Sequence, residues 1–254
     1  MLIDTHSHIY LSEFDSDREV MLMSAENEGI KQVLMPAIDK ETHFVMLETE
    51  GQHPEKCFSM MGLHPCSVKA GYKEELNILR EYFEKRRFVA VGETGLDFYW
   101  DRTFTKEQYD SFQFQIALAM QYDIPVVIHS RNSIDECIKV IQDNQQGNLK
   151  GVFHCFSGNE KQAKEIIDLG FYLGIGGVVT FKNSGLDKVM VDIDMKNIVL
   201  ETDAPYLAPV PFRGKRNECS YLKYVVEKLA EIKDVSKEEV ENITTKNAKE
   251  LFSI

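Results

Sequence analysis

Residues 1–8 read Met-Leu-Ile-Asp-Thr-His-Ser-His, and this stretch contains the two patterns that decide the fold prediction. Its first part, residues 2–4, is a short apolar run typical of a buried β-strand. Its second part places His6 and His8 directly after that run. The same combination, a buried run followed by a histidine or a carboxylate, recurs along the chain.

Eight apolar runs rich in Val, Ile, Leu and Phe are predicted as strands: residues 2–4, 32–37, 57–63, 89–92, 126–128, 151–153, 171–175 and 198–201. Amphipathic segments with helical periodicity, such as 107–122 and 160–169, separate them, and 236–252 forms a closing helical region. Strands that alternate with helices favour a parallel sheet. Eight such units in 254 residues match one (β/α)₈ TIM barrel, an α/β fold of about 250 residues. We therefore predict one domain, residues 1–254; the alternative is an open, doubly wound sheet.

Composition restricts the possible partners and compartment. The chain has no apolar run near the roughly 18 residues that span a bilayer, and its N-terminus has no signal-peptide pattern. Five cysteines without a Cys-x-x-Cys pair indicate free thiols, so we expect a cytoplasmic protein with no membrane contact. The net charge of −12 argues against a broad basic face for duplex DNA. A nucleic acid would have to be held locally, and a small substrate is equally compatible.

Five of the seven histidines and two carboxylates lie at the ends of predicted strands: His6, His8, His64, Glu93, His129, His154 and Asp203. In a TIM barrel the C-terminal strand ends open onto one face, where active sites lie. We therefore expect these side chains, although far apart in the sequence, to meet in one pocket at that face.

The residue types in this set indicate metal binding. His6 and His8, two positions apart on extended backbone, point the same way and can bind one metal. Imidazole with carboxylate suits Zn²⁺, Mn²⁺, Fe²⁺ or Co²⁺ better than an all-oxygen Mg²⁺ site. An open catalytic site typically has three protein ligands, whereas two metals about 3.5–4 Å apart share a bridging carboxylate. We predict two divalent cations, with Zn, Mn, Mg and Co as candidates, on His6, His8, Glu93, His129, His154 and Asp203, with Glu93 as the bridge.

Several of these motifs together resemble the TatD family of metal-dependent deoxyribonucleases, among the amidohydrolase-like TIM barrels. The resemblance runs nearly end to end, through residues 4–8 (DTHSH), 62–65 (GLHP), 92–97 (GETGLD), 128–131 (IHSR), 154–158 (HCFSG), 201–207 (ETDAPYL) and 213–218 (RGKRNE). Two positions depart from the family pattern: Cys66 stands where a second histidine often follows His-Pro, and Cys219 replaces a frequent proline. Neither position is a metal ligand in the family.

The resemblance implies a division of the ligands between two metals. One metal would lie on His6, His8, Glu93 and Asp203, and the other on Glu93, His129 and His154. It further implies hydrolysis of DNA phosphodiester bonds, commonly as a 3′→5′ exonuclease on single strands. The expected partner is therefore single-stranded DNA, with no obligate protein partner and a monomeric enzyme.

Other residues are predicted to assist the chemistry. Asp203 is the candidate for orienting the attacking water or accepting its proton. Glu201 is expected to support a ligand or to bind a further metal, and His64 to hydrogen-bond a phosphate or leaving group, or to order a neighbour. Phosphate contacts are predicted for Arg131, Lys182 and a basic turn that contains Arg213, Lys215 and Arg216.

Two questions stay open from the sequence alone. Tyr99 and Trp100 follow the Glu93 motif, where they either stack bases or pack beneath their loop. The alternative function is hydrolysis of a small amide or ester, or of an aminoacyl-tRNA ester. Many two-metal amidases need a carboxylated lysine as the bridge, whereas Glu93 bridges without modification, and this difference favours the nuclease.

Overall fold

The computed structural model describes residues 1–254 and contains eight parallel strands in alternation with helices. The strands are β1 (Leu2–Asp4), β2 (Ile30–Pro36), β3 (Cys57–Met60), β4 (Val91–Asp97), β5 (Val126–Arg131), β6 (Gly151–Phe153), β7 (Phe171–Ile175) and β8 (Ile198–Leu200). Neighbours pair in chain order, β1 to β3 in one run and β4 to β8 in another.

Backbone contacts at two places join these runs into a barrel. Met61 and Val91 form a parallel bridge between the ends of β3 and β4. On the other side, the amide of Thr5 donates to the carbonyl of Leu200 at 2.9 Å, which connects β1 to β8. The predicted closed (β/α)₈ barrel is therefore confirmed, and the open sheet is excluded.

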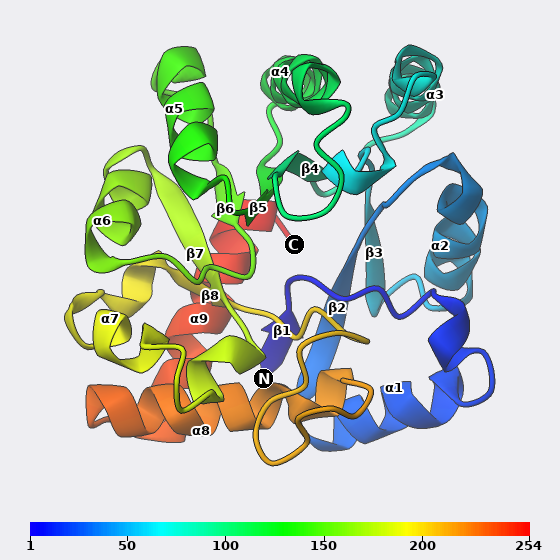
Figure 1. The fold of residues 1–254 in the computed structure, drawn as a ribbon. Helices are drawn as coiled ribbons and strands as arrows, with labels where there is room; N and C mark the ends of the chain where they lie inside the picture. Colours follow the sequence, from blue (N-terminus) through cyan, green and yellow to red (C-terminus); the bar gives the residue numbers. More distant parts are fainter.

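Helices surround the strands in the order in which they occur along the chain (Figure 1). They are α1 (Arg18–Asn27), α2 (Lys40–Gln52), α3 (Tyr72–Lys85), α4 (Thr105–Tyr122), α5 (Ile134–Asn144), α6 (Glu160–Asp168), α7 (Leu186–Asp192), α8 (Leu222–Lys233) and α9 (Lys237–Phe252). The last of these, red in Figure 1, passes behind the strands and contacts β1 and β8. None of these helices combines the length and the apolar character needed to cross a membrane.

The barrel interior is apolar at its N-terminal end and polar at its C-terminal end. Interior residues of six strands pack with α9 into one cluster: Ile3, Leu34, Met60, Val127, Val152 and Val199 with Ala248, Leu251 and Phe252. Side chains two positions apart on a strand face the same side. His129, His154 and Glu201 each follow one of these residues by two positions, so the register that buries the core also aims these three side chains into the polar end.

Two strands extend further than the sequence predicts. β4 continues to Asp97 and β5 to Arg131, so Glu93 and His129 lie within strands rather than beyond or at their ends. Gly95 in β4 pairs with His129 in β5. A Cβ atom on Gly95 would lie 2.1 Å from the carbonyl oxygen of His129, so only glycine permits this pairing. The apolar pattern underestimated β4 because Glu93 and Gly95 interrupt it.

Candidate metal centre

The buried carboxylate of Glu93 is at the centre of the site. Its Oε2 atom lies 3.1 Å from His6 Nε2 and 3.5 Å from His8 Nε2. Its Oε1 atom lies 2.9 Å from both His129 Nδ1 and His154 Nε2. Glu93 is only 2% exposed, and its two oxygens face different imidazoles.

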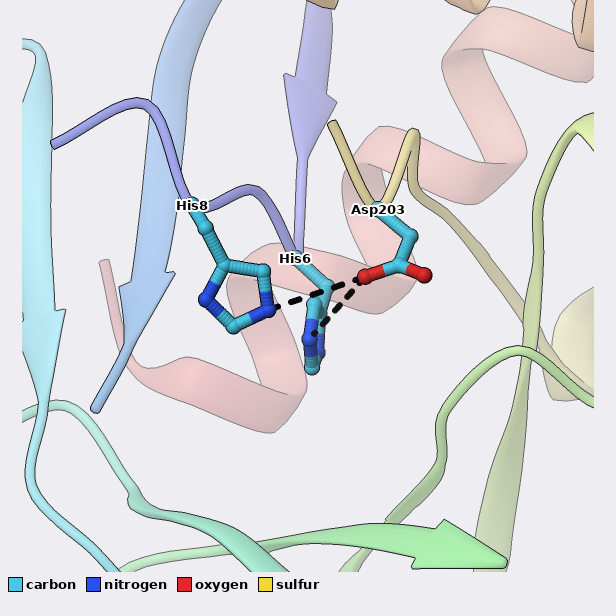
Figure 2. A group of neighbouring side chains, drawn as sticks. All are labelled: His6, His8 and Asp203. Carbon is cyan, nitrogen blue, oxygen red and sulfur yellow. Dashed lines mark ion pairs between the residues drawn. The ribbon is translucent and has the colours of Figure 1, made fainter. Parts of the chain in front are cut away.

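Asp203, from the loop after β8, joins the first pair of histidines. Its Oδ1 atom lies 3.7 Å from His6 Nε2 and 3.6 Å from His8 Nε2 (Figure 2). The amide of Asp203 donates to the carbonyl of His6 at 2.8 Å, which fixes the two loops together. We call His6, His8 and Asp203 the His6 group, and His129 with His154 the His129 group; Glu93 lies between them.

Tyr10 orients one imidazole of the His6 group. Its hydroxyl donates to the carbonyl of Pro36 at 2.6 Å, so it is left to accept from His8 Nδ1 at 3.1 Å. This arrangement places the proton of His8 on Nδ1 and leaves the Nε2 lone pair directed at Glu93 and Asp203. We did not predict Tyr10, although it follows His8 by the same two positions that separate His6 and His8.

Asp97 has the corresponding role for the His129 group. Its Oδ2 atom lies 2.9 Å from His129 Nε2, while the Nδ1 atom of the same ring faces Glu93. The other carboxylate oxygen accepts the amides of Tyr99 and Trp100 at 2.9 and 3.0 Å. The side chain of Asp97 therefore holds both the candidate ligand His129 and the loop that carries Tyr99 and Trp100, which we call the aromatic loop.

Glu201 lies at the ring nitrogen of His154 that does not face Glu93. Its Oε1 atom lies 3.3 Å from His154 Nδ1 and accepts the amide of Cys155 at 2.5 Å. A Cβ atom on Gly174 would lie only 2.4 Å from Glu201 Oε2, so a glycine in β7 makes room for this carboxylate. Glu201 is 1% exposed, which matches a supporting carboxylate rather than a group in contact with substrate.

Asp4 connects the loops that carry the His6 group. Its two oxygens accept the amide of Thr202 at 2.9 Å and the hydroxyl of Thr202 at 2.6 Å. Burial raises the pKa of Asp4 to about 7, against the lowering effect of these hydrogen bonds. The contact joins the end of β1 to the residue before Asp203, so Asp4 positions ligands that come from opposite ends of the chain.

The chemistry of the donors fits transition-metal ions. Both ring nitrogens of His6 are buried without a hydrogen-bond partner, which is costly unless another group binds them. Burial lowers the pKa of His6 to about 4 and that of His8 to about 3, so both are neutral near pH 7, as metal ligands must be. His64 Nε2 lies 3.4 Å from Glu93 Oε1, so His64 with Glu93 and His129 forms a further grouping that can hold a metal. The sequence predicts a hydrogen-bonding role for His64 and no ligand role.

A cavity of about 920 Å³ leads to these residues. Three of the predicted phosphate contacts, Arg131, Arg213 and Lys215, line it. Lys182 lies outside it, in a smaller neighbouring depression. The prediction is wrong for Arg216, which does not line the cavity and instead binds Asp17 through two hydrogen bonds of 2.8 and 2.7 Å.

The aromatic loop lies open at the rim rather than packed away. Tyr99 and Trp100 are 51% and 64% exposed, and Trp100 lines the cavity. The guanidinium of Arg131 lies over both rings, 4.0 and 5.2 Å from their centroids. Cation and rings thus form one continuous surface beside the candidate ligands.

Comparisons with known proteins identify the family. A family model described as TatD related DNase matches residues 3–253. The metal-dependent hydrolase YabD of Bacillus subtilis is 37% identical over 255 residues, which cover 100% of both chains. The 3′-5′ ssDNA/RNA exonuclease TatD of Erwinia tasmaniensis is 28% identical, again over 100% of both. The crystal structure of the Escherichia coli TatD homologue YjjV has a TM-score of 0.94 at 29% identity and covers 100% of this chain and 98% of that one. The chain therefore belongs to the TatD related DNase family and is a metal-dependent hydrolase.

Proposed function

We propose that this hydrolase cleaves DNA phosphodiester bonds with two divalent cations, and that it removes nucleotides from the 3′ end of single strands. The observation that carries the proposal is the position of Glu93, whose two oxygens face two separate groups of ligands. Two cations bound there would acidify a water molecule and neutralise charge on the phosphate. The similarity to the exonuclease of Erwinia tasmaniensis supports the substrate class.

The buried carboxylates have different access to a substrate. The side chain of Asp203 is 13% exposed and lines the cavity, whereas Glu201 is 1% exposed and does not. Burial raises the pKa of Asp203 well above its usual range, which brings a general base closer to neutral pH. We therefore propose that Asp203 accepts the proton of the attacking water and that Glu201 orients His154.

The cations at the cavity favour a phosphorylated substrate. Arg131, Arg213 and Lys215 line the cavity, and none of them forms an ion pair with a carboxylate. In a chain with a net charge of −12, these three cationic side chains would attract phosphate to one place. The exposed rings of Tyr99 and Trp100 offer stacking surfaces to unpaired bases, which favours single strands over duplexes.

Cleavage of a 5′-labelled DNA oligonucleotide by the metal-reconstituted protein tests this function. We expect stepwise shortening from the 3′ end, abolished by a chelator, with the RNA of the same sequence measured in parallel. If Mg²⁺, Mn²⁺, Zn²⁺ and Co²⁺ all fail to support cleavage while a small ester or amide is hydrolysed, the nuclease proposal is wrong and the small-molecule alternative holds.

Lowering the pH from 8 to 6 is expected to release metal from the His129 group before the His6 group. Burial lowers the pKa of His154, but Glu93 and Glu201 outweigh it and raise that pKa well above its usual range. A proton must therefore leave His154 before metal binds, and each pH unit below its pKa weakens binding about tenfold. In the His6 group, burial raises the pKa of Asp203, so this one donor also takes up a proton, whereas His6 and His8, with lowered pKa values, stay neutral throughout this range and retain their metal.

Equilibrium dialysis followed by elemental analysis measures this release. The expected metal content falls from two ions per chain towards one between pH 8 and pH 6. Loss of both ions in a single step, or retention of both at pH 6, would contradict the assignment.

Asp97→Asn is expected to weaken the metal at the His129 group about 10- to 100-fold, as loss of a supporting carboxylate typically does. The asparagine oxygen would keep the amides of Tyr99 and Trp100, so the NH2 group would face His129 Nε2. This group cannot accept the Nε2 proton, and the ring loses its fixed orientation. Metal titration of the apo protein measures the effect, with Asp101→Asn as the control because Asp101 is exposed and contacts no candidate ligand; it pairs with Lys69 and accepts the amide of Thr103. Equal affinity in both variants would show that Asp97 does not position His129.

A further inference from the structure

A second, smaller cavity of about 380 Å³ adjoins the metal cavity. It is lined by Phe181, Lys182, Asn183, Ser184, Val210 and Arg213. Two of these residues, Phe181 and Arg213, also line the metal cavity, so the two spaces share a wall. The second cavity therefore lies directly beside the metal cavity.

The walls of this cavity are built by close packing between two loops. The segment after β7 contains a short 3₁₀ helix, Gly177–Thr180, and the other wall comes from the loop after β8. The amide of Val210 donates to Thr180 Oγ1 at 2.9 Å. A Cβ atom on Gly177 would lie 2.2 Å from the carbonyl oxygen of Leu207, so the loops touch through their backbones. The cavity is consequently formed before any substrate arrives.

The lining offers the contacts that a nucleotide requires. Lys182 and Arg213 supply positive charge, and neither forms an ion pair. The guanidinium of Arg213 lies 3.8 Å from the centroid of Phe181, which holds it at the boundary of the two cavities. Val210 is 46% exposed and offers apolar surface to a base, beside the exposed amide of Asn183. The phosphate, the base and the polar edge of a nucleotide would each contact a side chain of suitable chemistry in this cavity.

We propose that this second cavity binds a nucleotide of the retained strand, on the 5′ side of the bond being cleaved. This inference rests on the proposed function, because removal of the 3′-terminal nucleotide leaves all further nucleotides on the 5′ side. Lys182, for which the sequence predicts a phosphate contact, then binds the phosphate of this adjacent nucleotide rather than the cleaved one. The enzyme then discriminates between long and short strands by binding, at a site separate from the metals.

Substrate length tests the proposal. We would measure kcat/KM for DNA strands of two, three, four and six nucleotides with wild type, Lys182→Ala and Lys188→Ala. Lys188 is exposed on α7 and lines neither cavity, so its variant should match wild type at every length. For Lys182→Ala, the loss should grow from less than twofold on the dinucleotide to about fivefold on the hexanucleotide, mainly through KM.

Binding without turnover separates this inference from the proposed function. Anisotropy of a labelled DNA hexanucleotide in chelator should show weaker binding to Lys182→Ala, with a salt slope smaller by about 0.7, the value for one single-strand phosphate contact. Equal losses on dinucleotide and hexanucleotide would place Lys182 at the cleaved phosphate and overturn the proposal, as would no loss at either length. If wild type cleaves no strand yet the binding difference appears, the proposed function fails while the second cavity stands as a nucleotide site.

Discussion

Glu93→Gln is expected to lower DNA cleavage roughly 10³-fold or more, the scale seen when charge stabilisation at a reacting centre is removed. The amide has the size of the carboxylate but only one oxygen, so it cannot face both ligand groups as an anion. Burial raises the pKa of Glu93, yet the neighbouring charges of His154 and His64 outweigh it and hold that pKa well below its usual range. Glu93 is therefore ionised at neutral pH, and its loss should reduce the metal content from two ions to one or none.

The matched control is Glu136→Gln, an exposed glutamate on α5. It should keep both metals and wild-type turnover, and circular dichroism of both variants checks that each is folded. A Glu93→Gln protein that retained two metals and cleaved DNA at the wild-type rate would refute the bridging role.

Asp203→Asn is expected to reduce kcat about 10²- to 10⁴-fold, the usual contribution of a general base. The metal at the His129 group should remain, because the carboxylate of Asp203 pairs with His6 and His8 and with neither His129 nor His154. KM should change little, since the cations that line the cavity are untouched. Steady-state kinetics with elemental analysis of the same sample separates loss of the base from loss of metal.

Asp192→Asn, at an exposed position in α7, is the control for this substitution. An Asp203→Asn enzyme with full metal content and unchanged turnover would mean that another group takes the proton.

The barrel and the direction of the His129 and His154 side chains follow from a short-range rule. The spacing of two between Val127 and His129, and between Val152 and His154, is visible in the sequence, and burial of the first residue dictates the direction of the second. The strand order then needs only the preference of parallel strands for sequential neighbours. This is why residues spread from His6 to Asp203 could be predicted to meet.

Contacts made by loops could not be predicted in the same way. Arg216 lies in the same basic turn as Arg213, yet it pairs with Asp17, which is 199 positions away in the chain. Lys182 lies beside a different cavity from Lys215. A long cationic side chain binds whichever carboxylate or space lies within its reach, and no periodicity in the sequence records that neighbour.

Crystals of the metal-loaded protein, measured at the absorption edge of Mn²⁺ or Zn²⁺, examine the bridging arrangement most directly. We predict two anomalous peaks about 3.5–4 Å apart, one beside each oxygen of Glu93. A single peak, or two peaks with Glu93 bound to neither, would contradict the account.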